Sequence, residues 1–246
     1  MSAAGGDPWE RHAGWWQDRY TDGADPEYEE QLLPLVDEHL AGASRVLDVG
    51  CGEGQVARRV SNLGAEVVGI DPTVAQLAIA RERAGGPHYV RAAAEAVPLR
   101  DGSCDGAVSS LVFEHLDPFE PAVAETARVL APGGRFLLFL NHPLLQAPGS
   151  GWVIDHILDE QYWRVGPYLP DDVAMEEVAP GVDLPFMHRP LSRYVNELAG
   201  HGLFIEHAAE PPPAPGFLAR APEYTDAATI PRLLLLVTRK RRPSDG

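Results

Sequence analysis

Apolar runs rich in Val, Ile and Leu alternate with helical patterns through the first 140 residues of the chain. Helices are predicted over residues 55–62, 73–84 and 118–130, with Thr73 as the cap of the second. This alternation is typical of a doubly wound α/β fold, in which helices cover both faces of a parallel sheet. The predicted strands are residues 45–50, 66–71, 88–91, 105–112 and 135–140.

The pattern changes after His142. Residues 143–190 combine several prolines and glycines with five aromatic side chains, which are too many for a flexible linker. We expect an irregular insertion that lies over the ligand end of the sheet. The remaining predicted elements are one or two amphipathic helices over 9–39, a helix over 191–200, strands over 203–208 and 232–238, and a proline-rich loop at 211–215.

Charge and cysteine usage limit the possible partners and compartments. The 246 residues include 20 Lys and Arg against 36 Asp and Glu, a formal net charge of -16, so we expect no nucleic-acid partner. Lys240 is the only lysine, which excludes a Schiff-base or P-loop lysine. Cys51 and Cys104 form no metal-binding or disulfide pattern. With no leader pattern and no long apolar run, we expect a cytoplasmic protein without a membrane span.

A glycine-rich loop follows the first predicted strand, in the segment Asp48-Val-Gly-Cys-Gly-Glu-Gly54. Doubly wound sheets bind adenosine-containing cofactors at this position, where glycine lets the backbone approach the ligand. The dinucleotide fingerprint GxGxxG would place its third glycine at Gln55, whereas the glycines here are 50, 52 and 54. The spacing therefore disfavours a dinucleotide.

Carboxylates surround this loop, which suits a ligand with cationic groups. Asp48 and Glu53 flank the glycines, and a pyrophosphate would be repelled by both. S-adenosylmethionine carries an ammonium and a sulfonium group and no phosphate. Asp71 ends the second predicted strand, where a carboxylate accepts hydrogen bonds from ribose hydroxyls.

From Ser44 to Pro143 the chain resembles the class I S-adenosylmethionine-dependent methyltransferases, especially the small-molecule enzymes that include those of quinone biosynthesis. The resemblance implies a Rossmann-like, mostly parallel sheet of seven strands, with the last strand antiparallel between the fifth and sixth. It also implies S-adenosylmethionine as cofactor and S-adenosylhomocysteine as product. The segments that carry it are VLDVGCGEG, VVGIDPT, AAAEAVPLRDGSCDGAVSS, LVFEHL and RVLAPGGRFLL.

The resemblance assigns roles to single residues. It places Asp71 on the ribose, the Ala94 N–H on the adenine ring, and the Leu111 carbonyl on the methionyl ammonium. Many relatives have an Asp for the adenine amino group where this chain has Ala93, and Glu95 is the candidate substitute. Tyr20 either covers the methionyl end of the cofactor or belongs to the core. The predicted cofactor-binding residues are Tyr20, Asp48, Gly50, Cys51, Gly52, Gly54, Asp71, Pro72, Ala94, Glu95 and Leu111.

Three side chains after the fourth and fifth predicted strands are candidates for catalysis: Glu114, His115 and His142. Methyl transfer needs a base only when the nucleophile is a poor one, such as an alcohol. We expect His142 to remove the proton from an acceptor hydroxyl, with Glu114 orienting the acceptor or the histidine. His115 either contributes to the chemistry or packs against the following helix. In the similar cyclopropane fatty acid synthases, matching positions lie at the reacting centre, which ranks Glu114 and His142 higher.

The leading hypothesis is O-methylation of a sugar or another hydroxylated small molecule. C-methylation of a lipid or quinone ring, a catalytically silent cofactor-binding regulatory module and a nicotinamide dehydrogenase are the alternatives. Mg²⁺ is possible but not demanded, because Asp155, His156, Asp159, Glu160 and His142 could converge. The aromatic insertion binds the acceptor or forms a homodimer interface. The predicted single domain has a helical cap (1–43), a cofactor-binding core (44–142), an acceptor-side insertion (143–190), the rest of the sheet (191–238) and a polar tail (239–246).

Overall fold

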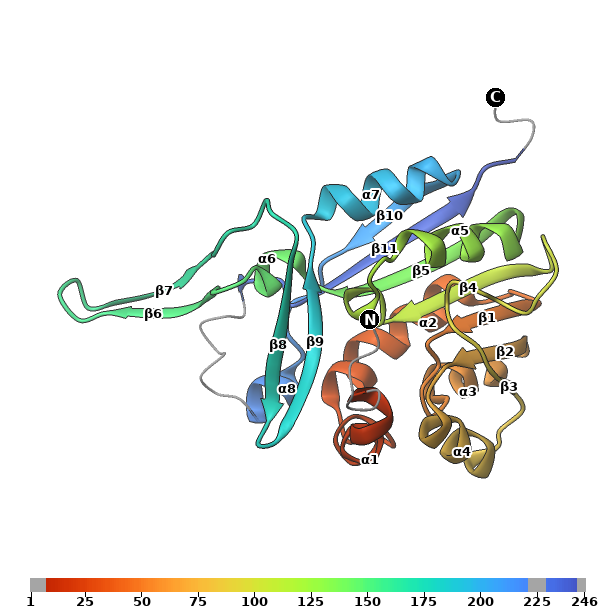
Figure 1. Cartoon of the computed structure of the whole chain (residues 1–246), viewed down its shortest axis with the longest axis horizontal. Coiled ribbons are helices and arrows are strands. Elements are labelled where there is room, and N and C mark those ends of the chain that lie inside the picture. The colour runs from red at the N-terminus through yellow and green to blue at the C-terminus, as the bar shows by residue number, and fades with distance from the viewer. Residues whose placement is uncertain (1–7, 221–228, 243–246) are drawn as a thin grey trace.

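The computed structural model describes residues 8–220 and 229–242, so the ends of the predicted cap (1–7) and tail (243–246) lie outside the described residues. Its centre is a seven-stranded sheet with the order β10-β11-β5-β4-β1-β2-β3 (Figure 1). Strand β11 is antiparallel to both β5 and β10, which confirms the expected last strand between the fifth and sixth. The strands are β1 (Arg45–Val49), β2 (Glu66–Asp71), β3 (His88–Arg91), β4 (Cys104–Ser110), β5 (Leu130–Asn141), β10 (Leu203–Ala209) and β11 (Leu233–Lys240).

Both faces of this sheet are buried, so its central strands are nearly continuous apolar runs. Successive side chains of β11 alternate between two hydrophobic clusters: Leu234 and Leu236 pack in one, and Leu233 and Leu235 in the other. Because β11 continues to Lys240, the predicted tail begins too early. The covering helices are α2 (Leu33–Leu40), α3 (Gln55–Asn62), α4 (Val74–Arg83), α5 (Glu120–Val129) and α7 (Leu191–Gly200).

Helix α1 (Pro8–Tyr20) packs against α4. After a short loop, the π-helical turn η1 (Tyr28–Leu32) continues directly into α2. Thr73 is the N-cap residue of α4, as predicted, but its side chain makes no capping hydrogen bond. The Glu10 carboxylate of α1 accepts the first N–H groups of α4 instead. A residue more than 60 positions away therefore supplies the cap, which local sequence reasoning cannot find.

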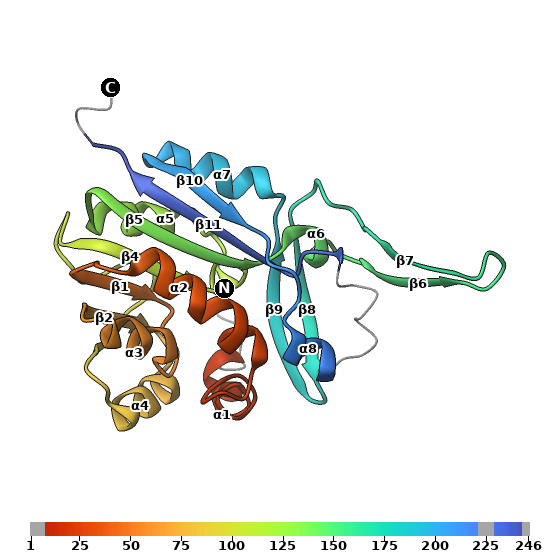
Figure 2. The same cartoon turned by 180° about the vertical axis from the view of Figure 1, so that it is seen from behind.

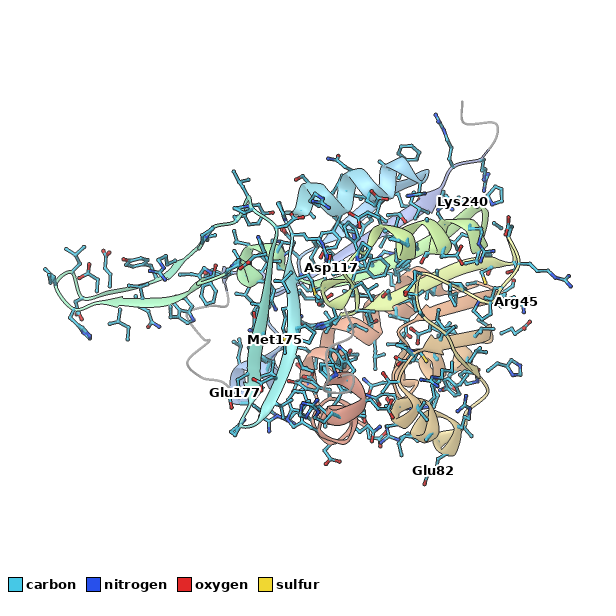
Figure 3. The ribbon with its side chains drawn as sticks, viewed as in Figure 1. Arg45, Glu82, Asp117, Met175, Glu177 and Lys240 are labelled. Atoms are coloured by element: carbon cyan, nitrogen blue, oxygen red, sulfur yellow. The ribbon has the colours of Figure 1, made fainter. Side chains whose placement is uncertain are left out.

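The insertion is not irregular chain, and that prediction is wrong. It forms two antiparallel hairpins (Figures 1 and 2) after a short helix, α6 (Pro143–Gln146). Three of these strands escape pattern reading because they contain no buried residue, and Met175 and Glu177 on one of them are exposed (Figure 3). The fourth strand contains Pro185. The hairpin strands are β6 (Gly151–Asp155), β7 (Glu160–Arg164), β8 (Asp172–Ala179) and β9 (Val182–His188).

The two hairpins differ in what they touch. Strand β9 contacts both α1 and the short 3-10 turn η2 (Phe113–His115), and thus borders the carboxyl end of β4. The β6–β7 hairpin stands away from the body of the molecule in both views (Figures 1 and 2). A final short helix, α8 (Pro215–Arg220), follows the predicted proline-rich loop.

Candidate cofactor-binding site

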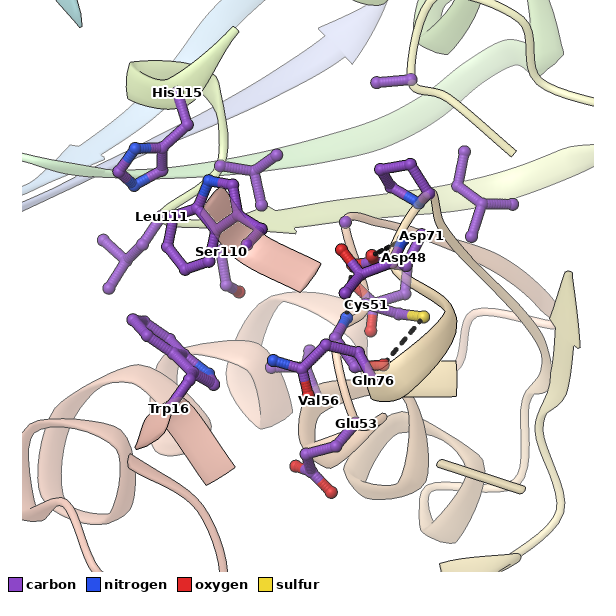
Figure 4. Close-up of a pocket in the computed structure, with 18 of the residues that line it drawn as sticks. Trp16, Asp48, Cys51, Glu53, Val56, Asp71, Gln76, Ser110, Leu111 and His115 are labelled. Carbon is purple, nitrogen blue, oxygen red and sulfur yellow. Dashed lines mark hydrogen bonds between the residues drawn. The ribbon is translucent and has the colours of Figure 1, made fainter. Parts of the chain in front are cut away.

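A cavity of about 350 Å³ lies at the carboxyl ends of β1, β2 and β4 (Figure 4). This is where parallel α/β sheets bind their ligands, and the volume is within the range of small-molecule sites. The glycine loop, the ends of β2 and β4, the turn after β3 and helix α1 all contribute. The residues that line the cavity include Trp9, Trp16, Tyr20, Thr21, Tyr28, Asp48, Gly50, Cys51, Gly52, Glu53, Asp71, Pro72, Gln76, Ala94, Glu95, Ser110, Leu111, His115 and Leu116.

The three loop glycines have positive φ angles of 72°, 52° and 86° at residues 50, 52 and 54. Side chains at two of them would collide: a Cβ at Gly50 would lie 2.5 Å from Val112 Cγ2, and one at Gly54 would lie 2.2 Å from the Tyr89 hydroxyl. A Cβ at Gly52 would meet no atom within 4 Å. Since Gly52 lines the cavity, this open space is available to a ligand.

Asp71 fixes the shape of the loop from the neighbouring strand. Its Oδ2 accepts the N–H of Gly52 at 2.9 Å, and its Oδ1 accepts the N–H of Thr73 at 2.8 Å. Each carboxylate oxygen can accept a second hydrogen bond. Asp71 therefore holds the loop and can still receive hydroxyl groups from a ligand in the cavity.

Asp48 places a carboxyl group under the loop, almost fully buried. Burial raises its pKa to about 7, assisted by the nearby charge of Asp71, and its Oδ2 has no hydrogen-bond partner among the described residues. An unpaired buried carboxylate is costly unless a cation approaches it. The site therefore favours a ligand that brings positive charge.

Glu53 does not share this role as fully as the sequence suggested. Its Oε2 pairs with Arg58 at 2.6 Å and also with Arg83, so two guanidinium groups compensate its charge. Arg83 further pairs with Asp22 and hydrogen-bonds Thr21, just beyond the end of α1. Glu53 thus links the glycine loop to the N-terminal segment. Asp48, by contrast, forms no ion pair with a described residue.

Leu111, immediately after β4, has a left-handed backbone with φ of 57°. This conformation is uncommon for a non-glycine residue and clusters at functional sites. The Leu111 N–H donates to the Phe139 carbonyl at 3.1 Å, which fixes the turn where it borders the cavity.

His115 faces the cavity from η2, across from Asp71 in the view of Figure 4. Its Nδ1 lies 2.7 Å from the Pro185 carbonyl, so Nδ1 carries the proton and Nε2 is the acceptor nitrogen of a neutral ring. Burial lowers its pKa to about 4. The guanidinium of Arg189 donates to the carbonyls of Phe113 and Leu116, which fixes the turn that presents the ring.

The chain is similar in sequence to known methyltransferases. Residues 47–138 match a family model described as a methyltransferase domain. A malonyl-[acyl-carrier protein] O-methyltransferase of Enterobacter lignolyticus is 41% identical over 91 residues, 37% of this chain and 36% of that protein. A ubiquinone/menaquinone biosynthesis C-methyltransferase of Methylobacterium nodulans is 38% identical over 133 residues, 51% of each chain. The chain therefore spans about a third to a half of these curated relatives.

Solved structures extend the likeness over most of the chain. An S-adenosylmethionine-dependent methyltransferase from Mesorhizobium loti superposes with a TM-score of 0.75 at 29% identity, covering 89% of this chain and 99% of that one. The chain therefore contains a methyltransferase domain and resembles S-adenosylmethionine-dependent methyltransferases in sequence and fold. A second solved structure, of an S-adenosylmethionine-dependent methyltransferase from Listeria monocytogenes, superposes with a TM-score of 0.74 at 26% identity. The match covers 88% of this chain and 97% of that one.

The residues present fit the cofactor of this methyltransferase family. The unpartnered Asp48 Oδ2 suits a cationic group, Asp71 suits the ribose, and the space at Gly52 admits a ligand against the backbone. Of the predicted cofactor-binding residues, Gly54 alone does not line the cavity; it begins α3 behind the loop. Those that line it are Tyr20, Asp48, Gly50, Cys51, Gly52, Asp71, Pro72, Ala94, Glu95 and Leu111.

The expected catalytic residues separate in the structure. His142 is not among the cavity-lining residues: its Nδ1 accepts the Leu144 N–H at 3.1 Å and its Nε2 lies 2.9 Å from Glu210. Both ring nitrogens are thus engaged, so the geometry does not support His142 as the base. The backbone turns away at Pro143 into α6, and His142 caps that helix.

Glu114 also lies outside the cavity lining. It is buried, and its Oε1 accepts both the backbone N–H and the side-chain amide of Asn141. Burial raises its pKa to about 7. Glu114 therefore joins the end of β5 to η2, beneath the residue that does face the cavity, His115.

No metal site forms from the predicted ligands. Asp155, His156, Asp159 and Glu160 lie on or beside the projecting β6–β7 hairpin. Among residues 8–220 and 229–242, no group of three or more His, Cys, Asp or Glu side chains could hold a metal ion. In the same ranges, no helix has both the length and the apolarity needed to cross a membrane.

Sequence reasoning missed several lining residues. Trp9 and Gln76 were not singled out because an aromatic or amide on a helix has no distinctive spacing. Tyr28 is buried and borders the cavity from η1. Ser110 ends β4, and its hydroxyl lacks a hydrogen-bond partner among the described residues. The position of Ser110, directly before Leu111, is the one signal that could have identified it.

Proposed function

We propose that the chain is an S-adenosylmethionine-dependent methyltransferase that acts on a small molecule. The observation that carries this proposal is one cavity that joins the Asp48 and Asp71 carboxylates at the glycine loop to the free acceptor nitrogen of His115. When bound, the cofactor supplies an electrophilic methyl group. Both curated relatives named above are methyltransferases, one acting on oxygen and the other on carbon.

The chain's own contribution is to hold the two reactants in line and to exclude water. Asp71 would hold the ribose of the cofactor, and Asp48 and the Leu111 carbonyl would hold its cationic end. Helix α1 covers the cavity through Trp9, Trp16 and Tyr20. The acceptor enters on the side of His115 and Leu116.

We infer that O-methylation of a hydroxylated acceptor is the reaction, with His115 rather than His142 as the proton acceptor. Nε2 of the neutral ring accepts a hydrogen bond from the acceptor hydroxyl and orients an oxygen lone pair toward the methyl group. The low pKa of His115 makes the ring a poor base toward a free hydroxyl. The proton becomes far more acidic as the O–C bond forms, and Nε2 can then take it.

C-methylation of an electron-rich ring is the second candidate, favoured by the 38% identity to the quinone-pathway relative. The same His115 nitrogen would accept a hydrogen bond from a ring hydroxyl and take its proton as the bond from the ring carbon to the methyl group forms. Loss of the proton from that carbon to solvent would then restore the aromatic ring. Product analysis separates the two reactions, because the transferred methyl group is attached to oxygen in one and to carbon in the other.

The test is incubation of the purified chain with S-adenosylmethionine labelled with ¹³C in the methyl group and a panel of hydroxylated small molecules. Acceptor-dependent S-adenosylhomocysteine is expected, with a labelled methyl resonance in the O–CH₃ region. A C–CH₃ resonance would select the second candidate. Binding of S-adenosylhomocysteine with no turnover across the panel would contradict an enzyme and favour the silent binding module.

A further inference from the structure

We propose that the methyl acceptor is a flat aromatic hydroxyl compound that carries no negative charge, bound against a row of aromatic side chains on α1. This proposal rests on the proposed methyl transfer and specifies the acceptor class of the same cavity. The sequence alone predicts a sugar or another hydroxylated small molecule as acceptor, and the proposal restricts this to a neutral or cationic aromatic hydroxyl compound.

The aromatic row begins at β9 and ends at the last turn of α1. Ring centroids of Phe186 and His115 lie 4.5 Å apart, those of His115 and Trp9 4.7 Å, those of Trp9 and Trp16 5.5 Å, and those of Trp16 and Tyr20 4.4 Å. All but Phe186 line the cavity. One wall of the site is therefore a continuous set of rings from α1 and η2, and Phe186 of β9 packs behind His115.

Flat aromatic ligands match such a wall better than puckered ones. Ring pairs in stacked or edge-to-face contact gain about 0.5–1.5 kcal/mol beyond the area that they bury. A puckered sugar ring, by contrast, cannot lie flat against these side chains over its whole face. Figure 4 shows Trp16 and His115 on the same side of the cavity, away from the carboxylates at Asp48 and Asp71.

The charge of the lining sets the second requirement. No Lys or Arg is among the residues that line the cavity in the described part of the chain, whereas four carboxyl groups are: Asp48, Glu53, Asp71 and Glu95. Arg58 and Arg83 compensate the charge of Glu53. A carboxylate or phosphate on the acceptor would find no Lys or Arg in this lining and would be repelled by Asp48, Asp71 and Glu95. The acceptor is accordingly neutral or cationic.

His115 supplies the polar group that orients such an acceptor. The ring is held by the Pro185 carbonyl at Nδ1 and by edge contacts with Trp9 and Phe186, so Nε2 has a fixed direction. A single ring hydroxyl satisfies this nitrogen. In the transfer, the bond from sulfur to the methyl carbon breaks, the O–CH₃ bond forms, and the hydroxyl proton moves to Nε2.

Calorimetric titration of the full chain, saturated with S-adenosylhomocysteine, compares three probes of the same skeleton. 2-Naphthol is flat and neutral, trans-decahydro-2-naphthol is puckered and neutral, and 6-hydroxy-2-naphthoate is flat and anionic. We expect 2-naphthol to bind at least tenfold more tightly than either of the others at pH 8. Equal affinity for the puckered or the anionic probe, or no binding of 2-naphthol, overturns the proposal.

Two variants and a control locate the binding. Trp9→Leu and Trp16→Leu should each weaken 2-naphthol binding at least fivefold, and by a larger factor than they weaken S-adenosylhomocysteine binding. Trp152→Leu, in the projecting β6–β7 hairpin, should change neither. Unchanged 2-naphthol binding in both α1 variants contradicts the proposal. The three-probe comparison needs no variant, so it remains decisive if a variant fails to fold. Failure of S-adenosylhomocysteine itself to bind would instead overturn the proposed function.

Discussion

The Glu10 carboxylate of α1 caps helix α4 by accepting the Val74 N–H at 2.7 Å. The same carboxylate accepts the Ala75 N–H at 3.1 Å, and Gln17 donates to the side chain of the next residue, Gln76, at 2.9 Å. These bonds attach α1, with its aromatic residues, to the helix that follows Asp71. The cover of the cavity is thus fixed to the part of the sheet that binds the cofactor.

Glu10→Ala should loosen this cover. Loss of a helix N-cap costs about 1 kcal/mol, and a carboxylate at the N-terminus of a helix adds a favourable charge–dipole interaction. We expect urea unfolding to show a decrease of about 1–2 kcal/mol in the free energy of unfolding, and hydrogen exchange to speed up in α1. Glu82→Ala, on the exposed end of α4 (Figure 3), is the control. Equal stability of both variants would show that the cap contributes nothing.

Gly52→Ala should block cofactor binding. Gly64→Ala is a matched control, because both glycines have positive φ and neither Cβ would meet an atom within 4 Å, but only Gly52 lines the cavity. Each substitution should cost about 1 kcal/mol of stability through backbone strain. Titration with S-adenosylhomocysteine should show at least a tenfold weaker affinity for Gly52→Ala alone. A similar loss in both variants would mean that strain, rather than the filled space, is responsible.

Cofactor affinity should rise with pH through the titration of Asp48. Its pKa is raised to about 7, and a cationic ligand binds the ionised form, so the bound carboxyl has a lower pKa than the free one. The ionised fraction grows about tenfold between pH 6 and pH 8 for such a pKa, and the affinity should follow it. Asp48→Asn should bind at least tenfold more weakly at pH 8 and lose this dependence. A flat pH profile in the unsubstituted chain contradicts the role of Asp48.

His115 and His142 should respond differently to substitution. His115→Ala removes the cavity-facing Nε2 and should lower kcat at least tenfold with the cofactor Kd unchanged, as steady-state kinetics and calorimetry can measure. His142→Ala removes the cap of α6 and the bond to Glu210, and should lower thermal stability with a smaller effect on kcat. The reverse ranking of the two kcat values would restore His142 as the base.

The sheet and the cofactor end of the site could be predicted because local patterns determine them. Buried strands need apolar residues on both faces, and the glycines of the loop are required by positive φ at Gly50, Gly52 and Gly54. Asp71 was found because the end of the second strand must lie beside that loop. The antiparallel last strand came from the family resemblance rather than from its own residues.

The acceptor end could not be predicted because tertiary contacts assemble it. His115 was ranked below His142, although β9 supplies the Pro185 carbonyl that fixes its tautomer from 70 residues away. The charge of Glu53 was overestimated because its partner Arg83 lies on another helix. The two hairpins were missed since β6, β7 and β8 contain no buried residue and β9 contains Pro185.

Calorimetric titration of the purified chain with S-adenosylhomocysteine, and separately with NAD, tests the cofactor assignment most directly. We predict one S-adenosylhomocysteine bound per chain with micromolar affinity, at least a tenfold loss in Asp71→Asn, and no heat of binding with NAD. Binding of NAD without S-adenosylhomocysteine would contradict the assignment and, with it, methyl transfer at this site.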